Sequence, residues 1–139
     1  MVNLKKKNDV AVMVSNEALT ALNWFGIQAT SGDNGEIRYN DVVRWIYDAL
    51  YRMNVECDFV WPESEDLSQY KAIFVPALYA APDSTLERLN QYVKDGGTLV
   101  VTFKSGFANE NVRFMQMHSR ISLKMLWVSA MISLPFRAM

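Results

Sequence analysis

The sequence predicts an α/β domain in which helices form a layer on each side of a mainly parallel β-sheet. Short continuous apolar runs recur along the chain, and such runs are typical of strands buried on both faces of a parallel sheet. Amphipathic helical patterns separate them, most clearly over residues 41–53 and 84–95. The stretch from Lys71 to Gly106 combines both features, because it contains a strand, a helix and a second strand. This order predicts a right-handed crossover unit.

Four strands are expected, and they cover residues 9–14, 55–61, 72–75 and 98–103. Pro62 and Pro76 end the second and third of them, since proline has no N–H to donate to a neighbouring strand. The order of strands and helices along the chain predicts a three-layer, flavodoxin-like domain. Its sheet order is 2-1-3-4, and a fifth strand is expected next to the fourth.

Two helices are expected before the second strand. Ser15 or Asn16 caps a short first helix, and residues 26–38 form a loop rich in glycine and turn residues. Asn40 is predicted to cap the second helix, which runs from Asp41 to about Met53. The carboxylate of Asp41 lies in the first turn, where the helix dipole favours a negative charge. The apolar stripe of this helix is predicted to contain Val43, Ile46, Tyr47, Leu50 and Met53.

The third helix has a start signal and a stop signal. Ser84 and Glu87 have the S-x-x-E spacing of a capping box, which predicts a start near Ser84. The pair Gly96-Gly97 supplies a residue that can enter the left-handed region and end the helix. Its apolar stripe is predicted to contain Leu86, Leu89, Tyr92 and Val93.

The composition of the chain argues against several classes of function. A chain of 139 residues with a net charge of −1 fits one domain without general attraction to nucleic acid or to anionic membranes. The single Cys57 excludes an internal disulfide and a multi-cysteine zinc site, and the single His118 argues against a histidine-based metal site or triad. The apolar run Val10–Val14 after Lys5–Lys7 is too short for a signal peptide, so a cytoplasmic protein is expected.

In such a sheet, ligands bind at the carboxyl ends of the strands. Here those ends are predicted at residues 15–17, 76–79 and 104–106. No glycine-rich phosphate loop follows the first strand, which argues against a bound nucleotide or flavin. A class I glutamine amidotransferase would carry a nucleophilic cysteine on an elbow after a strand, but residues 78–80 contain none. No cofactor is expected.

Other side chains that could carry chemistry have simpler explanations. Glu63, Glu65 and Asp66 could be imagined as paired carboxylates for acid/base work, but a solvated turn is the favoured interpretation. Cys57 lies within a predicted strand, where sheet packing explains it. Core burial or chance exposure is favoured over a sugar-stacking or subunit-contact surface for three tryptophans: Trp24, Trp45 and Trp61. No catalytic, cofactor-binding or metal-binding residue is assigned.

Several segments together resemble the trimerisation domain of family 42 glycoside hydrolases, the bacterial β-galactosidases. The matching segments are DVAVMVSNEA from Asp9, YNDVVRWIYDALYRMNVECDFV from Tyr39, DLSQYKAIFVPALY from Asp66, and GGTLVVTFKSGFANEN from Gly96. They follow one another in the family's order and spacing from Asp9 to Asn111. The resemblance therefore covers about three quarters of the chain.

The resemblance implies a class I glutamine amidotransferase-like fold and a domain that follows a catalytic (β/α)8 barrel. It also implies a homotrimer in which this domain packs against neighbouring subunits. The catalytic glutamates of that family lie in the barrel, so no catalytic residue is carried over to this chain. The expected function is non-catalytic oligomerisation in a β-galactosidase that acts on terminal β-D-galactosides. The alternatives are an accessory module that completes a neighbouring subunit's sugar site and a stand-alone amidotransferase-like enzyme.

The chain is expected to divide into a leader (1–8), the trimerisation-like domain (9–111) and an atypical C-terminal tail (112–139). The tail contains no acidic residue and departs from the family pattern. One interpretation is a shift of reading frame near Phe114, and the rival is a genuine helix over residues 121–134. On either interpretation, the tail could replace the fifth strand, cover a sheet edge or promote self-association.

Overall fold

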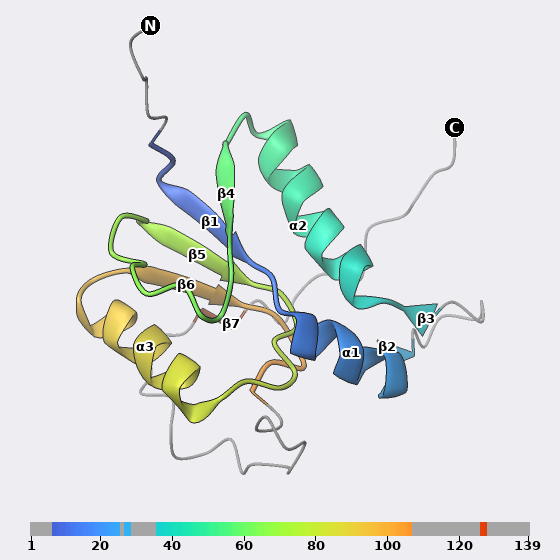
Figure 1. Ribbon diagram of the computed structural model, residues 1–139. Helices are drawn as coiled ribbons and strands as arrows, with labels where there is room; N and C mark the ends of the chain where they lie inside the picture. The colour runs from blue at the N-terminus through green and yellow to red at the C-terminus, as the bar shows by residue number, and fades with distance from the viewer. Residues whose placement is uncertain (1–6, 26, 29–35, 107–125, 128–139) are drawn as a thin grey trace, which may run out of the picture.

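The computed structural model describes residues 7–25, 27–28, 36–106 and 126–127, and within them strands and helices alternate along the chain (Figure 1). The main sheet consists of β1 (Val10–Met13), β4 (Cys57–Val60), β5 (Ala72–Val75), β6 (Thr98–Val101) and β7 (Leu126–Trp127). The helices are α1 (Asn16–Trp24), α2 (Tyr39–Arg52) and α3 (Asp83–Lys94). A separate antiparallel pair, β2 (Ile27–Gln28) and β3 (Glu36–Ile37), lies within the segment that was expected to be loop throughout.

The main sheet has the order β4-β1-β5-β6-β7, and every neighbouring pair is parallel. The first four positions confirm the predicted order 2-1-3-4. β7 lies where the fifth strand was expected, and it comes from the segment 112–139. Its residues Leu126 and Trp127 pair with Val100 and Val101, which contradicts a helix at those two positions. The other residues of the tail, with Phe114, His118 and the postulated frame shift, lie outside the described residues.

Helices cover both faces of the sheet, which confirms the predicted α/β layering. In Figure 1, α3 lies on one side of the strands, while α1 and α2 lie on the other. Because side chains alternate between the two faces of a strand, Ile73 and Leu99 occupy one face in register with Ala11. These residues are fully or almost fully buried and belong to one core cluster with Leu89 and Tyr92 of α3. The predicted apolar stripe of α3 is therefore the side that packs on the sheet.

α3 starts one residue earlier than predicted and without the expected capping box. Pro82 is its N-cap residue, and no side chain caps the helix. The carbonyl of Pro82 accepts the N–H groups of Thr85 and Leu86 at 3.0 and 3.3 Å. Proline already has a φ angle of −59°, close to the helical value, so it can begin the helix without a side-chain acceptor. Ser84 is displaced into the first turn and is exposed.

α2 also starts earlier than predicted, at Tyr39 with Arg38 as the N-cap residue. The carboxylate of Asp41 accepts the backbone N–H of Arg38 at 3.0 Å, so Asp41 acts from the third helical position and Asn40 does not cap the helix. The reason is that the acidic side chain in the third helical position reaches back to the N-cap N–H, which is one half of a capping box.

The apolar stripe predicted for α2 is only partly buried. Leu50 is buried, and Val43 and Ile46 are half-buried, but Tyr47 and Met53 are 40% and 63% exposed. The buried side is instead centred on Tyr39, Val42 and Leu50. The helix is rotated so that its tyrosines flank the buried stripe and remain at the surface.

The glycine pair after α3 ends the helix as predicted, and its two members act differently. Gly96 has a φ angle of +99°, in the left-handed region, and its N–H donates to the carbonyl of Val93 at 3.1 Å. Gly97 lies against the buried ring of Tyr92, and a Cβ atom there would come within 2.2 Å of the ring. The hydroxyl of Tyr92 donates to the carbonyl of Tyr70 at 3.0 Å, which fixes the ring in this place.

Replacing Gly97 with Ala is expected to lower the free energy of unfolding by roughly 1–3 kcal/mol, because the added methyl group overlaps a ring that is held at its far end. Gly96→Ala is the matched control, since a Cβ there meets nothing within 4 Å and only backbone strain of about 1 kcal/mol is added. Urea denaturation followed by circular dichroism measures both. A Gly97→Ala protein as stable as the wild type would contradict the packing described for Tyr92.

Candidate functional site

The carboxyl end of β1 is closed by its own side chains. The Oγ atom of buried Ser15 accepts the N–H of Ala18 at 3.1 Å, which confirms Ser15 as the N-cap residue of α1, and it donates to the carboxylate of Glu17 at 3.0 Å. The backbone N–H of Ser15 donates to the hydroxyl of Tyr39 at 2.9 Å. Burial raises the pKa of Tyr39, so the phenol stays neutral. The first turn of α1 is thus engaged in internal hydrogen bonds at the place where a phosphate would bind.

The chain that follows β5 fills the neighbouring part of this edge. Residues 76–81 are all buried, although loops of this kind normally lie at the surface. The hydroxyl of Thr102 accepts the N–H of Ala77 at 2.7 Å, and the hydroxyl of Ser105 accepts the N–H of Leu78 at 3.0 Å. The N–H of Gly106 donates to the carbonyl of Leu78 at 2.7 Å. Side chains from the loop after β6 therefore take the place that a ligand's polar groups would occupy.

The turn after β5 has the strained backbone of an elbow but no nucleophile. Ala77 has a φ angle of +37°, which is unusual for a residue with a Cβ atom. Its carbonyl accepts the N–H of Tyr79 at 2.7 Å, so the chain reverses sharply here. Alanine supplies no thiol or hydroxyl, and its side chain is fully buried. The geometry at this edge does not support the chemistry of an amidotransferase.

Lys104 is positioned at the same edge by a left-handed backbone, with a φ angle of +57°. Its Nζ atom donates to the carbonyl of Phe25 at 3.2 Å, just beyond the end of α1. The ring of Phe25 stacks on Tyr79 with a centroid distance of 5.7 Å. The side chain of Lys104 therefore joins the loop after β6 to the end of α1, and the ring of Phe25 connects that end to the turn after β5.

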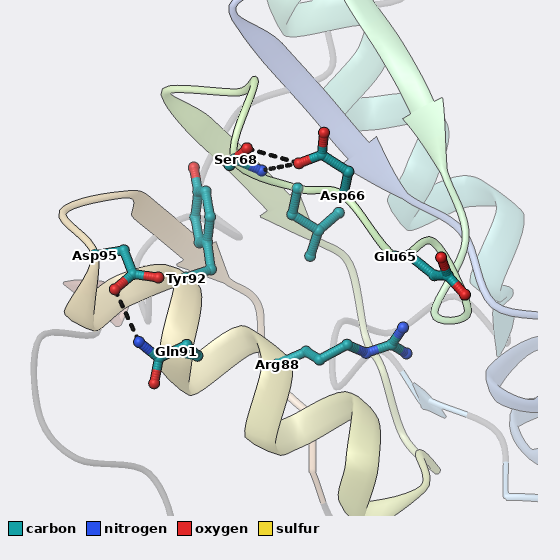
Figure 2. A pocket seen from close by; sticks show the side chains of 8 residues that line it. Glu65, Asp66, Ser68, Arg88, Gln91, Tyr92 and Asp95 are labelled. Carbon is teal, nitrogen blue, oxygen red and sulfur yellow. Dashed lines mark hydrogen bonds between the residues drawn. The ribbon is translucent and has the colours of Figure 1, made fainter.

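The acidic loop after β4 borders a small hollow beside α3 (Figure 2). The hollow has a volume of about 190 Å³ and is lined by Glu65, Asp66, Leu67, Ser68, Arg88, Gln91, Tyr92 and Asp95. The guanidinium group of Arg88 donates to the carbonyls of Glu63 and Ser64, each at 3.2 Å, and also to that of Pro62. Arg88 thus holds the turn after β4 against α3.

The carboxylates of this loop do not have the arrangement expected of an acid/base pair. The side chain of exposed Asp66 accepts the hydroxyl and the N–H of Ser68 at 2.6 and 3.0 Å, as Figure 2 shows. These hydrogen bonds lower the pKa of Asp66, whereas a general acid at neutral pH needs a raised pKa. The solvated-turn interpretation of Glu63, Glu65 and Asp66 accounts for what is observed.

Cys57 and the three tryptophans also have no common site. Cys57 is half-buried in β4, and burial together with the neighbouring Asp58 raises the pKa of its thiol, which keeps it protonated. The tryptophans lie on three different segments and are all exposed: Trp24 (83%) in α1, Trp45 (44%) in α2 and Trp61 (49%) after β4. Among the described residues, no group of three or more His, Cys, Asp or Glu side chains could hold a metal ion.

The structure groups a different set of aromatic side chains, which the sequence analysis did not single out. The ring of Tyr47 stacks on Tyr51 at a centroid distance of 6.4 Å and on Phe59 at 5.8 Å. The two tyrosines are four residues apart on α2, and this spacing was the available signal. The contact with Phe59 of β4 depends on how the helix lies on the sheet, which no local pattern specifies.

A family model for the β-galactosidase trimerisation domain matches residues 8–127 of the chain. The chain belongs to this family. Over 113 residues it is 37% identical to a β-galactosidase of Geobacillus sp. (strain Y412MC61), a match that covers 81% of this chain and 16% of that enzyme. It is 39% identical over 88 residues to a β-galactosidase of Planococcus sp. (strain L4), covering 63% of this chain and 13% of that enzyme.

Solved structures agree with this assignment. The β-galactosidase of Bacillus circulans sp. alkalophilus superposes with a TM-score of 0.70 at 35% identity, over 83% of this chain and 16% of that one. The trimerisation domain described here therefore spans about one sixth of the length of these enzymes, which are glycoside hydrolases. The family match confirms the resemblance and extends beyond Asn111, whereas the division of the chain into segments 1–8, 9–111 and 112–139 stays a prediction. In the described part of the chain, no helix has the length and apolar character needed to cross a bilayer.

The buried turn after β5 gives a test of the closed edge. Ser105→Ala is expected to lower the free energy of unfolding by about 1–3 kcal/mol, because the buried N–H of Leu78 loses its acceptor. Ser68→Ala removes a hydroxyl that bonds an exposed carboxylate, so its effect is expected to be within about 0.5 kcal/mol. Chemical denaturation compares the two variants. Equal stability of the Ser105→Ala variant and the wild type would mean that water reaches this turn and that the edge is open.

Proposed function

We propose that this chain is a non-catalytic assembly domain that holds together the subunits of a family 42 β-galactosidase. The observation that carries the proposal is the match to the trimerisation-domain family over residues 8–127. The closed carboxyl edge of the sheet supports the proposal. Ligands of such a fold usually bind at this edge, and here side chains and a turn of the same chain occupy it.

In this proposal, the hydrolysis of β-galactosides belongs to a catalytic barrel outside the region matched here. Retaining and inverting glycosidases both need a pair of carboxyl groups on a sugar-binding scaffold. The acidic residues of the loop after β4 are arranged as a turn and support no such pair. The partners of the chain are therefore other copies of itself and the barrel of the parent enzyme. The expected assembly contains three copies in total. A cytoplasmic location is consistent with the single cysteine.

The proposal predicts that the 139-residue chain associates with itself. Light scattering after size-exclusion chromatography should give a molar mass three times that of the 15.9 kDa chain at high concentration. Dilution should shift the population towards smaller species, because a domain that normally works inside a larger assembly keeps only part of the contact. A mass of one chain at every concentration up to the solubility limit would refute the proposed assembly function.

A further inference from the structure

One surface of the domain is unusually rich in exposed aromatic side chains. Tyr47, Tyr51, Phe59 and Trp61 are 40%, 71%, 44% and 49% exposed, and they are called the aromatic face below. The ring of Tyr47 stacks on those of Tyr51 and Phe59, so α2 and β4 present one continuous surface. Trp61 follows Phe59 by two residues, directly after the end of β4. Figure 1 shows α2 running alongside β4 at this border of the domain.

The remaining exposed apolar side chains show that this concentration is not general. Within the described residues, eight large hydrophobic side chains are exposed, and the aromatic face contains four of them. Trp24 and Phe25 lie at the end of α1, and Trp45 lies on the other flank of α2, since residues two apart on an α-helix point to nearly opposite sides. Because monomeric proteins rarely display large contiguous apolar patches, such a concentration indicates an interaction surface.

The same border of the domain is an open sheet edge. β4 is the outermost strand and pairs only with β1, so the N–H and C=O groups on its other side have no strand partner in the described sheet. Natural proteins protect such edges by covering or charging them, since an open edge invites pairing with another chain. Here the border carries aromatic rings, which favour contact with protein.

A hollow with a volume of about 630 Å³ lies between the C-terminal end of α2 and the start of β4. Tyr47 and Tyr51 of α2 line it together with Cys57 of β4. Its rim carries both signs of charge, with Arg52 from the helix and Glu56 before the strand. The hollow is large enough to accept several side chains from a neighbour.

We propose that the aromatic face is the surface through which one copy of this chain packs against a second copy. With about 200 Å² for each aromatic side chain, the exposed fractions of the four rings correspond to about 400 Å² of apolar surface. A stable interface buries about 800 Å² on each partner. The four rings therefore supply about half of what one partner must contribute, and the rim of the hollow lies next to them.

This inference rests on the proposed assembly function and specifies the surface that performs it. In a closed ring of three copies, each contact is of the head-to-tail kind, so the aromatic face of one copy meets a different surface of the next. A substitution on the aromatic face is present in every copy, so it weakens every contact between copies. Aromatic side chains at the centre of an interface commonly carry most of its binding energy.

The test is the double variant Tyr51→Lys/Trp61→Lys in the full 139-residue chain, studied by sedimentation equilibrium. Both side chains are substantially exposed, and Lys suits the last turn of α2, so the fold and its circular dichroism spectrum should be retained. The apparent dissociation constant is expected to rise at least 100-fold. The conservative variant Tyr51→Phe/Trp61→Phe keeps an aromatic ring at each position and should assemble like the wild type.

Trp24→Lys is the control for position, because it removes an even more exposed ring at the end of α1. It should leave the dissociation constant within a few-fold of the wild-type value. Hydrogen exchange of the wild-type chain gives an independent measurement that needs no variant. Amides of residues 45–61 should exchange more slowly at high than at low protein concentration.

An assembled wild type together with an equally assembled Lys double variant would overturn this inference and leave the proposed function intact. So would concentration-dependent protection that excludes residues 45–61. A wild-type chain that is monomeric at every concentration would overturn the proposed function, and the inference with it. Dissociation of the Lys double variant, with the Phe double variant assembled, is the result that the inference predicts.

Discussion

Two hydroxyl groups, those of Thr102 and Ser105, allow the chain after β5 to lie buried at the carboxyl edge of the sheet. A buried loop carries backbone N–H groups that need acceptors, and these hydroxyls accept the N–H groups of Ala77 and Leu78. Without them, the turn would have to move outwards to reach water, and the crevice that α/β folds use for ligands would open. The closed edge and the left-handed backbone of Ala77 belong to one local arrangement.

With this edge closed, the surface chemistry of the domain lies elsewhere. Where α2 lies beside β4, the aromatic face leaves rings in contact with water that would be more stable against protein. A domain whose task is to hold subunits together needs such a surface and does not need a crevice. The closed strand ends and the open aromatic border are thus two parts of the same functional account.

Much of the fold was predictable because its signals are local. Continuous apolar runs such as Ala72–Val75 specify buried strands, and Gly96 ends its helix for a reason that concerns only its own backbone. The helix starts were less predictable, because the N-cap residues Pro82 and Arg38 provide no side-chain cap of the usual kind. Residues with the usual capping side chains, Ser84 and Asn40, lie two positions further along the chain and were predicted instead. The family was recognisable from segments spread over the chain, since their order and spacing are specific even where no single residue carries chemistry.

The sequence did not predict the aromatic face as a unit, although Trp61 was one of three tryptophans considered for subunit contact. Tyr47 fits the apolar stripe of α2, and only the way that the helix lies on the sheet leaves it exposed. Likewise, the contact between Tyr47 and Phe59 joins residues from different elements, so it follows from packing and not from spacing. The hydroxyl acceptors Thr102 and Ser105 were missed for the same reason, since their partners lie more than twenty residues away along the chain.

The most direct test of the account is a crystal structure of the assembled chain, in which the contacts between copies can be seen. The account predicts that Tyr51 and Phe59 are buried against a neighbouring copy in every subunit, while residues 76–81 remain covered by the loop after β6. It would be contradicted by an assembly in which Tyr51 and Phe59 face solvent in every copy. An open crevice at the ends of β1 and β5 would contradict it equally.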